Sequence, residues 1–139
     1  MTGKLLVSIF AFIISLAFVS GTVMADEAKE DKLAKALEKY EITGKISRCV
    51  QLTRVSSSKV IDDYNILFKM KGRKAYLNTL PRRCSRLGFE RAFSYVVHTN
   101  QLCNTDIITV FDSTSNIQGP SCGLGKFVEY KKKPKSEKK

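Results

Sequence analysis

The chain has 139 residues, of which 24 are Lys or Arg and 13 are Asp or Glu, and its net charge at pH 7 is +11. This length is enough for one small domain and excludes a second one. The charge favours anionic partners such as phosphorylated glycolipid, acidic polysaccharide or nucleic acid. The single histidine excludes most arrangements in which a base activates a nucleophile.

The first 25 residues have the pattern of a secretory signal peptide. Lys4 precedes an apolar run at 5–19, and Val23 and Ala25 are side chains that a signal peptidase accepts before its cut. The alternative is an uncleaved membrane anchor. The run is shorter than the roughly 20 residues of a membrane span, and it reaches that length only if the residues up to the cut are counted with it. We therefore expect a mature chain from Asp26, no transmembrane span after processing, and a periplasmic or secreted location.

After the predicted cut, composition divides the chain into a charged helical segment at 26–41, a β domain at 42–130 and a tail at 131–139. The helix is predicted because four apolar residues recur with a 3.6-residue period: Leu33, Ala36, Leu37 and Tyr40. We expect Gly44 and the two residues before it to end this helix. The tail holds six lysines and no apolar side chain, which predicts disorder.

Short runs of β type fill the domain. Residues 65–70 alternate, with Ile66, Phe68 and Met70 on one face, and a tight connection at 71–73 leads into a partner strand at 74–80. The other predicted strands are 46–55 and 59–61, separated by a serine bend or bulge at 56–58, then 93–99, 107–111 and 127–130. The fold class predicted is mainly β: a small antiparallel barrel or sandwich of five to six strands, stapled by disulfides, with one short N-terminal helix.

The four cysteines are predicted to form two disulfides. They stand at Cys49, Cys84, Cys103 and Cys122, with no C-x-x-C pair, whereas structural zinc takes its ligands as close pairs. An exported chain also meets oxidising conditions. No metal and no cofactor is therefore expected. Three connectivities are open; we favour Cys84–Cys103 with Cys49–Cys122, which would tie the first strand to the end of the sheet.

Three residues are the candidates for catalysis: Asp62, Asp63 and His98. Neighbouring strand residues point to opposite faces, so the two aspartates address one substrate only if the chain bends. A turn explains them better, because Asp and Asn hydrogen-bond their own backbone in turns. His98 lies in an alternating segment and is expected at the surface of a sheet.

Two basic groups are the candidate anion-binding residues. One surrounds the hairpin tip, and the other surrounds the second cysteine: Lys69, Lys71, Arg73 and Lys74, then Arg82, Arg83 and Arg86. The alternative for both is solvation and protection of an edge strand. Aromatic residues interleave with them, as on strand-based nucleic-acid platforms; we expect these rings in the core and predict no specific nucleic-acid partner.

The order of the cysteine blocks carries a resemblance. The signature reads Cys49, Val60-Ile61-Asp62-Asp63, Ile66-Leu67-Phe68, Tyr76-Leu77-Asn78, Leu80-Pro81-x-x-Cys84, Leu87-Gly88-Phe89, Phe93-Ser94-Tyr95, Leu102-Cys103-x-x-Asp106-Ile107-Ile108 and Cys122-x-Leu124-Gly125-x-Phe127. It resembles a family of small exported bacterial domains of unknown function over 48–128. The resemblance implies a periplasmic or secreted bacterial protein with paired cysteines. It implies no activity.

Two functions follow as hypotheses. The first is a non-enzymatic binding or structural module of the bacterial envelope, in contact with anionic envelope components or polyanions. The second is a small envelope hydrolase or modifying enzyme that uses Asp62, Asp63 or His98. The two differ in whether these side chains converge in a concave site.

Overall fold

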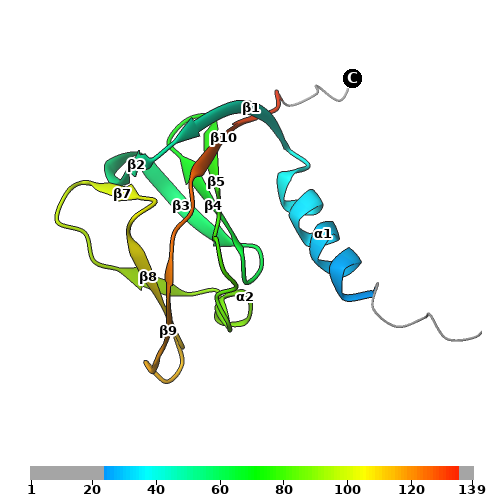
Figure 1. The fold of residues 1–139 in the computed structure, drawn as a ribbon. Coiled ribbons are helices and arrows are strands. Elements are labelled where there is room, and N and C mark those ends of the chain that lie inside the picture. The colour runs from blue at the N-terminus through cyan, green and yellow to red at the C-terminus, as the bar shows by residue number, and fades with distance from the viewer. Residues whose placement is uncertain (1–23, 135–139) are drawn as a thin grey trace, which may run out of the picture.

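The computed structural model describes residues 24–134 and shows a mainly β fold with a helix at its N-terminal side (Figure 1). Within that range ten strands form three antiparallel sheets. The elements are α1 (Met24–Leu37), β1 (Tyr40–Ser47), β2 (Cys49–Gln51), the 3-10 turn η1 (Leu52–Arg54), β3 (Val55–Val60), β4 (Asn65–Met70), β5 (Lys74–Thr79), α2 (Leu87–Glu90), β6 (Phe93–Tyr95), β7 (Gln101–Cys103), β8 (Ile107–Phe111), β9 (Gln118–Gly123) and β10 (Phe127–Lys132).

The largest sheet has five strands in the order β1-β10-β5-β4-β3. Its outer strands, β1 and β3, pair on one side only within the described chain, so the sheet is open. The barrel alternative is therefore wrong, and a sandwich describes the fold better. The smaller sheets, β2-β7 and β6-β8-β9, form the rest of the β structure. The expected five to six strands were too few. Strands β7 and β9 and most of β1 lie where no strand was predicted, and their positions are set by pairing with β2, β8 and β10.

The β4–β5 hairpin confirms the clearest local prediction. Ile66, Phe68 and Met70 enter the main apolar core, where the Phe68 ring meets the edge of the Phe127 ring at a centroid distance of 5.6 Å. Leu67 lies on the opposite face. The central sheet is therefore buried on both faces.

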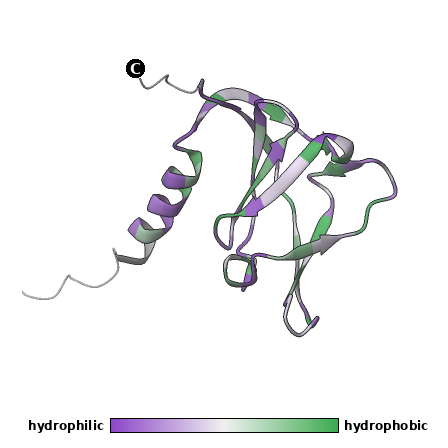
Figure 2. Cartoon of the chain, turned by 180° about the vertical axis from the view of Figure 1, so that it is seen from behind, coloured by the Kyte–Doolittle hydropathy of each residue, from purple (hydrophilic) through white to green (hydrophobic). Residues whose placement is uncertain are grey.

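Two leucines of α1 pack against the second face of the sheet. Leu67 packs with Ala75 and Leu77, and Leu33 and Leu37 of the helix lie against this cluster. Most of the other helical residues are hydrophilic (Figure 2). The helix therefore contributes a narrow apolar edge to the domain.

The helix ends at Leu37, earlier than predicted, and the chain enters β1 at Tyr40. Pairing with β10 overrides the helical period here, since Tyr40 stands opposite Lys132 in the register. Gly44 has a φ of +76° and lies where the register shifts between Ile42 and Ile46. The glycine expected to end a helix thus makes a bulge in a strand.

The signal segment and the tail lie at or beyond the limits of the described residues. The signal segment 1–25 lies outside the described residues apart from its last two positions, where α1 begins, so the cut stays a prediction. At the other end, β10 runs two residues into the segment 131–139, and the Lys133 amide donates to the Lys39 carbonyl at 2.9 Å. Residues 135–139, where disorder was predicted, also lie outside. No helix within residues 24–134 is both long enough and apolar enough to cross a bilayer.

Two disulfides are present, but their connectivity differs from the favoured one. Cys49 pairs with Cys103, and Cys84 pairs with Cys122. The first bond follows from strand pairing, because Cys49 and Cys103 stand opposite each other in the β2–β7 ladder. The second closes because the β8–β9 ladder places Cys122 beside the core, where Cys84 is fully buried. The spacing of the cysteines in the sequence does not indicate either pairing.

Candidate anion-binding groove

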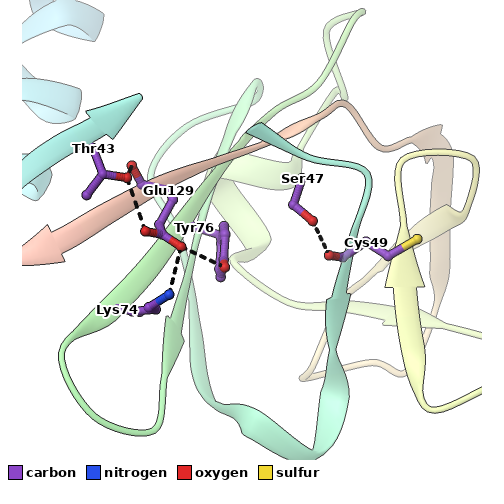
Figure 3. A network of polar contacts seen from close by, with 6 residues as sticks. All are labelled: Thr43, Ser47, Cys49, Lys74, Tyr76 and Glu129. Carbon is purple, nitrogen blue, oxygen red and sulfur yellow. Dashed lines mark hydrogen bonds and ion pairs between the residues drawn. The ribbon is translucent and has the colours of Figure 1, made fainter. Parts of the chain in front are cut away.

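A buried glutamate organises a polar network across strands β1, β10 and β5 (Figure 3). Glu129 of β10 stands opposite Tyr76 of β5 and is only 7% exposed. Its Oε2 accepts hydrogen bonds from Lys74 Nζ and Tyr76 OH, each at 3.1 Å. Thr43 Oγ1 of β1 donates to its Oε1 at 3.2 Å. Three strands are thus joined through one carboxylate.

The network fixes the protonation states of its acids. The hydrogen bond from Lys74 lowers the pKa of Glu129, and those from Tyr76 and Thr43 lower it further, whereas burial opposes them. Burial, followed by the hydrogen bond to Glu129, raises the pKa of Tyr76. At neutral pH the carboxylate is therefore ionised and the phenol is a neutral donor.

Around this network the surface is hollowed into a groove lined by basic side chains. A cavity of about 610 Å³ is bordered by Thr43, Lys45, Arg54, Lys71, Gly72, Arg73, Lys74, Glu129 and Lys131. A smaller cavity of about 210 Å³ shares Arg54, Lys71 and Lys74 with it and continues past Tyr76 to Cys49. We call these two cavities together the basic groove.

Backbone contacts hold the walls of the basic groove in place. The Lys71 amide donates to the Arg54 carbonyl at 2.7 Å, which ties η1 to the tip of the β4–β5 hairpin. Gly72 at that tip has a φ of +95°, a conformation that favours glycine. On the other side, Lys132 N donates to the Arg73 carbonyl at 2.7 Å, and the Arg73 guanidinium donates to the Lys132 carbonyl at 2.9 Å. The groove is preorganised by main-chain bonds.

The charge of the basic groove is unbalanced. Its linings include six basic residues and Glu129 is the one acid among them. Within residues 24–134 the ion pairs are Lys74–Glu129, Arg83–Asp63 and Arg86–Glu90. Five groove residues therefore have no acidic partner in the described chain: Lys45, Arg54, Lys71, Arg73 and Lys131. Such a concentration of one sign of charge in a concave surface attracts anions.

The structure places three of the four hairpin-tip candidates in the groove: Lys71, Arg73 and Lys74. Lys69 stands opposite Ala75, which belongs to the face against which α1 packs, so its side chain lies on the other side of the sheet.

Sequence reasoning missed the other groove residues: Lys45, Arg54, Lys131 and Glu129. They come from β1, η1 and β10, and only the sheet order brings these elements to the hairpin. Lys45 could have been found if 40–47 had been predicted as a strand of the same sheet.

The second basic group does not line the basic groove. Arg83 and Arg86 border a separate depression of about 800 Å³ beside α1, together with Asp62 and Asp63. The Arg83 guanidinium pairs with Asp63 at 2.9 Å, and Arg86 pairs with Glu90. Arg82 is exposed and borders neither hollow. The charge of this second group is therefore largely balanced by acids.

The aspartates of the alternative hypothesis have structural partners. Asp62 Oδ1 accepts from the Tyr64 and Asn65 amides at 2.7 and 2.9 Å, which confirms the turn interpretation. Asp63 Oδ1 accepts from the Gly88 amide at 2.9 Å, and its Oδ2 takes the ion pair with arginine. His98 is exposed in a bend after β6 instead of lying in a strand, and it does not border their depression. The three candidates do not converge.

The predicted core aromatics divide in two. Tyr76 and Phe93 pack against the main core, whereas Phe89 is 82% exposed and Tyr95 39% exposed. In the described part of the chain, three or more His, Cys, Asp or Glu side chains nowhere gather as a metal site would require. Comparison with protein-family models, curated proteins and solved structures finds no match, so the site is interpreted from its own chemistry.

Proposed function

We propose that this protein is an exported, non-enzymatic module of the bacterial envelope that binds anionic ligands in the basic groove. The observation that carries the proposal is the convergence, on one preorganised hollow, of five basic side chains that have no acidic partner among residues 24–134. Basic residues that only confer solubility are expected to be spread over the surface. The two disulfides support an oxidising location outside the cytoplasm.

The composition of the groove also favours one kind of recognition over another. Its one aromatic lining residue is Tyr76, whose hydroxyl is bound to Glu129. Platforms for single-stranded nucleic acid instead present several free rings on which bases stack. The groove therefore suits ligands recognised by charge and hydrogen bonding.

The test is a salt series of binding to dye-labelled polyphosphate, followed by fluorescence anisotropy. The groove variant Lys71→Ala/Arg73→Ala is compared with a control variant, Arg82→Ala/Lys126→Ala, which removes the same charge from exposed positions that do not line the groove. We expect the groove variant to lower the slope of log affinity against log salt by roughly two, one for each lost contact, and the control to leave it nearly unchanged. Equal losses in both variants would refute the groove as the binding site.

The tail is tested separately, by truncation after Pro134. Lys131 and Lys132 belong to β10, so a cut after Tyr130 would also remove partners of β1. A lower salt slope after truncation at Pro134 would assign part of the affinity to residues 135–139. An unchanged slope would assign all of it to the described domain.

A further inference from the structure

The floor of the basic groove carries a hydrogen-bond acceptor that a site for anions alone does not need. Glu129 is ionised, and its two oxygens are unequally occupied. Oε2 accepts from Lys74 and Tyr76, whereas among the described residues Thr43 is the one donor to Oε1. The Thr43 hydroxyl has one proton, which it shares with the Glu129 carbonyl oxygen at 3.1 Å. Oε1 is therefore the less satisfied oxygen of a carboxylate that lines the groove.

An ionised carboxylate selects ligands in a definite way. It repels a phosphate or sulfate group, but it accepts a strong, charge-assisted hydrogen bond from a hydroxyl. The surrounding lysines and arginines attract phosphate and sulfate groups, and they donate hydrogen bonds but cannot accept them. A ligand that satisfies both carries anionic groups and, a short distance away, a hydrogen-bond donor such as a free hydroxyl.

We infer that the basic groove recognises a phosphorylated saccharide, with its phosphate groups on the rim side chains and one sugar hydroxyl donating to Glu129 Oε1. This inference rests on the proposed function and adds to it the ligand class and a specificity-determining residue. The cavity of about 610 Å³ has the size of small-molecule sites in proteins, which is larger than a single anion needs. The saccharide can be free or the headgroup of a glycolipid, since both present the same chemistry.

The inference is tested with two probes of equal charge, glucose 1,6-bisphosphate and 1,6-hexanediol bisphosphate. They differ in the sugar ring and the hydroxyls that it carries, and the Glu129 variant described next isolates the contribution of the hydroxyl. Titration calorimetry on the purified protein should show about tenfold tighter binding of the sugar, since one hydrogen bond to a charged group is worth about that factor. Equal binding of the two probes would overturn the inference and leave the proposed function intact. Failure of both probes to bind would also overturn the inference, and the polyphosphate salt series would then decide the proposed function separately.

The role of Glu129 is tested with Glu129→Gln. In this variant the amide oxygen can keep the bonds from Lys74 and Tyr76, which places an NH₂ donor where Oε1 was. We expect the tenfold preference for the sugar to disappear, while binding of the diol bisphosphate stays equal or tightens because a negative charge is lost. A retained preference would exclude Glu129 as the determinant.

A second variant, Thr43→Val, tests whether the effect of Glu129→Gln comes from disturbed folding of the groove. It removes the single donor to Oε1 and leaves the carboxylate in place, so the preference for the sugar should be kept or increased. Loss of the preference in this variant would contradict the inference. The source of the saccharide is read from vesicles carrying a phosphorylated glycolipid, compared with the released headgroup: tighter binding to vesicles assigns the lipid, and equal or weaker binding assigns the free saccharide.

Discussion

Removing each disulfide separately gives a sharp test of the packing described above. The perturbations are the double variants Cys49→Ala/Cys103→Ala and Cys84→Ala/Cys122→Ala. The bonds close loops with sequence separations of 54 and 38 residues. Loop-closure entropy alone assigns them about 4.2 and about 3.9 kcal/mol, so it predicts a slightly larger loss for the first variant.

Burial reverses this order. Cys84 is fully buried in the main core and Cys122 packs against it, whereas Cys49 and Cys103 are half-buried at the β2–β7 ladder. Replacing a buried sulfur by hydrogen removes apolar contact and leaves a small void, which costs about 1 kcal/mol more. The variant without Cys84–Cys122 should therefore lose about 5 kcal/mol of unfolding free energy, and the variant without Cys49–Cys103 about 4 kcal/mol.

Urea unfolding followed by circular dichroism measures the difference. With a slope of about 1 kcal/mol per molar urea, the Cys84–Cys122 variant should unfold at a midpoint about 1 M lower than the other variant. A lower midpoint for the Cys49–Cys103 variant would refute the argument from burial and leave loop length as the deciding factor. Intact-mass analysis of the oxidised wild type, which should lack four hydrogens, confirms the starting state.

Two further predictions concern the groove and the loop that precedes β10. The folded-state pKa of Glu129 lies below its ordinary value of 4.5, so the ionised carboxylate stabilises the fold above that pH, and this contribution is lost as the pH falls through the folded pKa. In urea titrations the stability deficit of Glu129→Gln should be present at pH 7 and shrink as the pH is lowered below 4.5. A deficit that is independent of pH would contradict this. At Gly125 an added Cβ would lie 1.9 Å from the Thr79 carbonyl oxygen. Both the amide and the carbonyl of Gly125 are also hydrogen-bonded to the buried Asn78 side chain. The substitution Gly125→Ala should therefore cost about 3 kcal/mol of unfolding free energy, measured as a loss of thermal stability. Gly123→Ala is the matched control, since its Cβ meets no atom within 4 Å and should change stability little.

Local patterns in the sequence predicted the local parts of the fold. The β4–β5 hairpin was correct because alternation and the turn at Gly72 are both contained in about fifteen residues. The strand β1 was missed because the apolar spacing up to Tyr40 suits a helix and Gly44 suits a helix end. What decides its structure is the pairing with β10, some ninety residues later. The predicted cysteine pairing was wrong because the disulfides are also set by the pairing of strands far apart in the sequence.

The candidate site shows the same division. Lys71, Arg73 and Lys74 cluster in the sequence and were identified as a basic group. Glu129 was counted as one charge among others, because nothing in its neighbourhood in the sequence indicates that Lys74 and Tyr76 surround it. A site assembled from four separate segments can be recognised only when the sheet order is known.

The position of β10 has a consequence for how the chain acquires its structure. Within residues 24–134 the last strand, β10, lies between the first strand, β1, and β5, and it is the one strand that pairs with β1. Until residues 127–132 have been synthesised, β1 lacks the strand with which it pairs, and the hydrogen bonds that join Glu129 to β1 and β5 cannot form. Contacts of such wide sequence separation slow folding, because the chain must close a long loop before any of them forms. Assembly of the complete five-stranded sheet is thus delayed until β10 is available, so a chain interrupted before residue 127 would leave β1 without its place in the sheet.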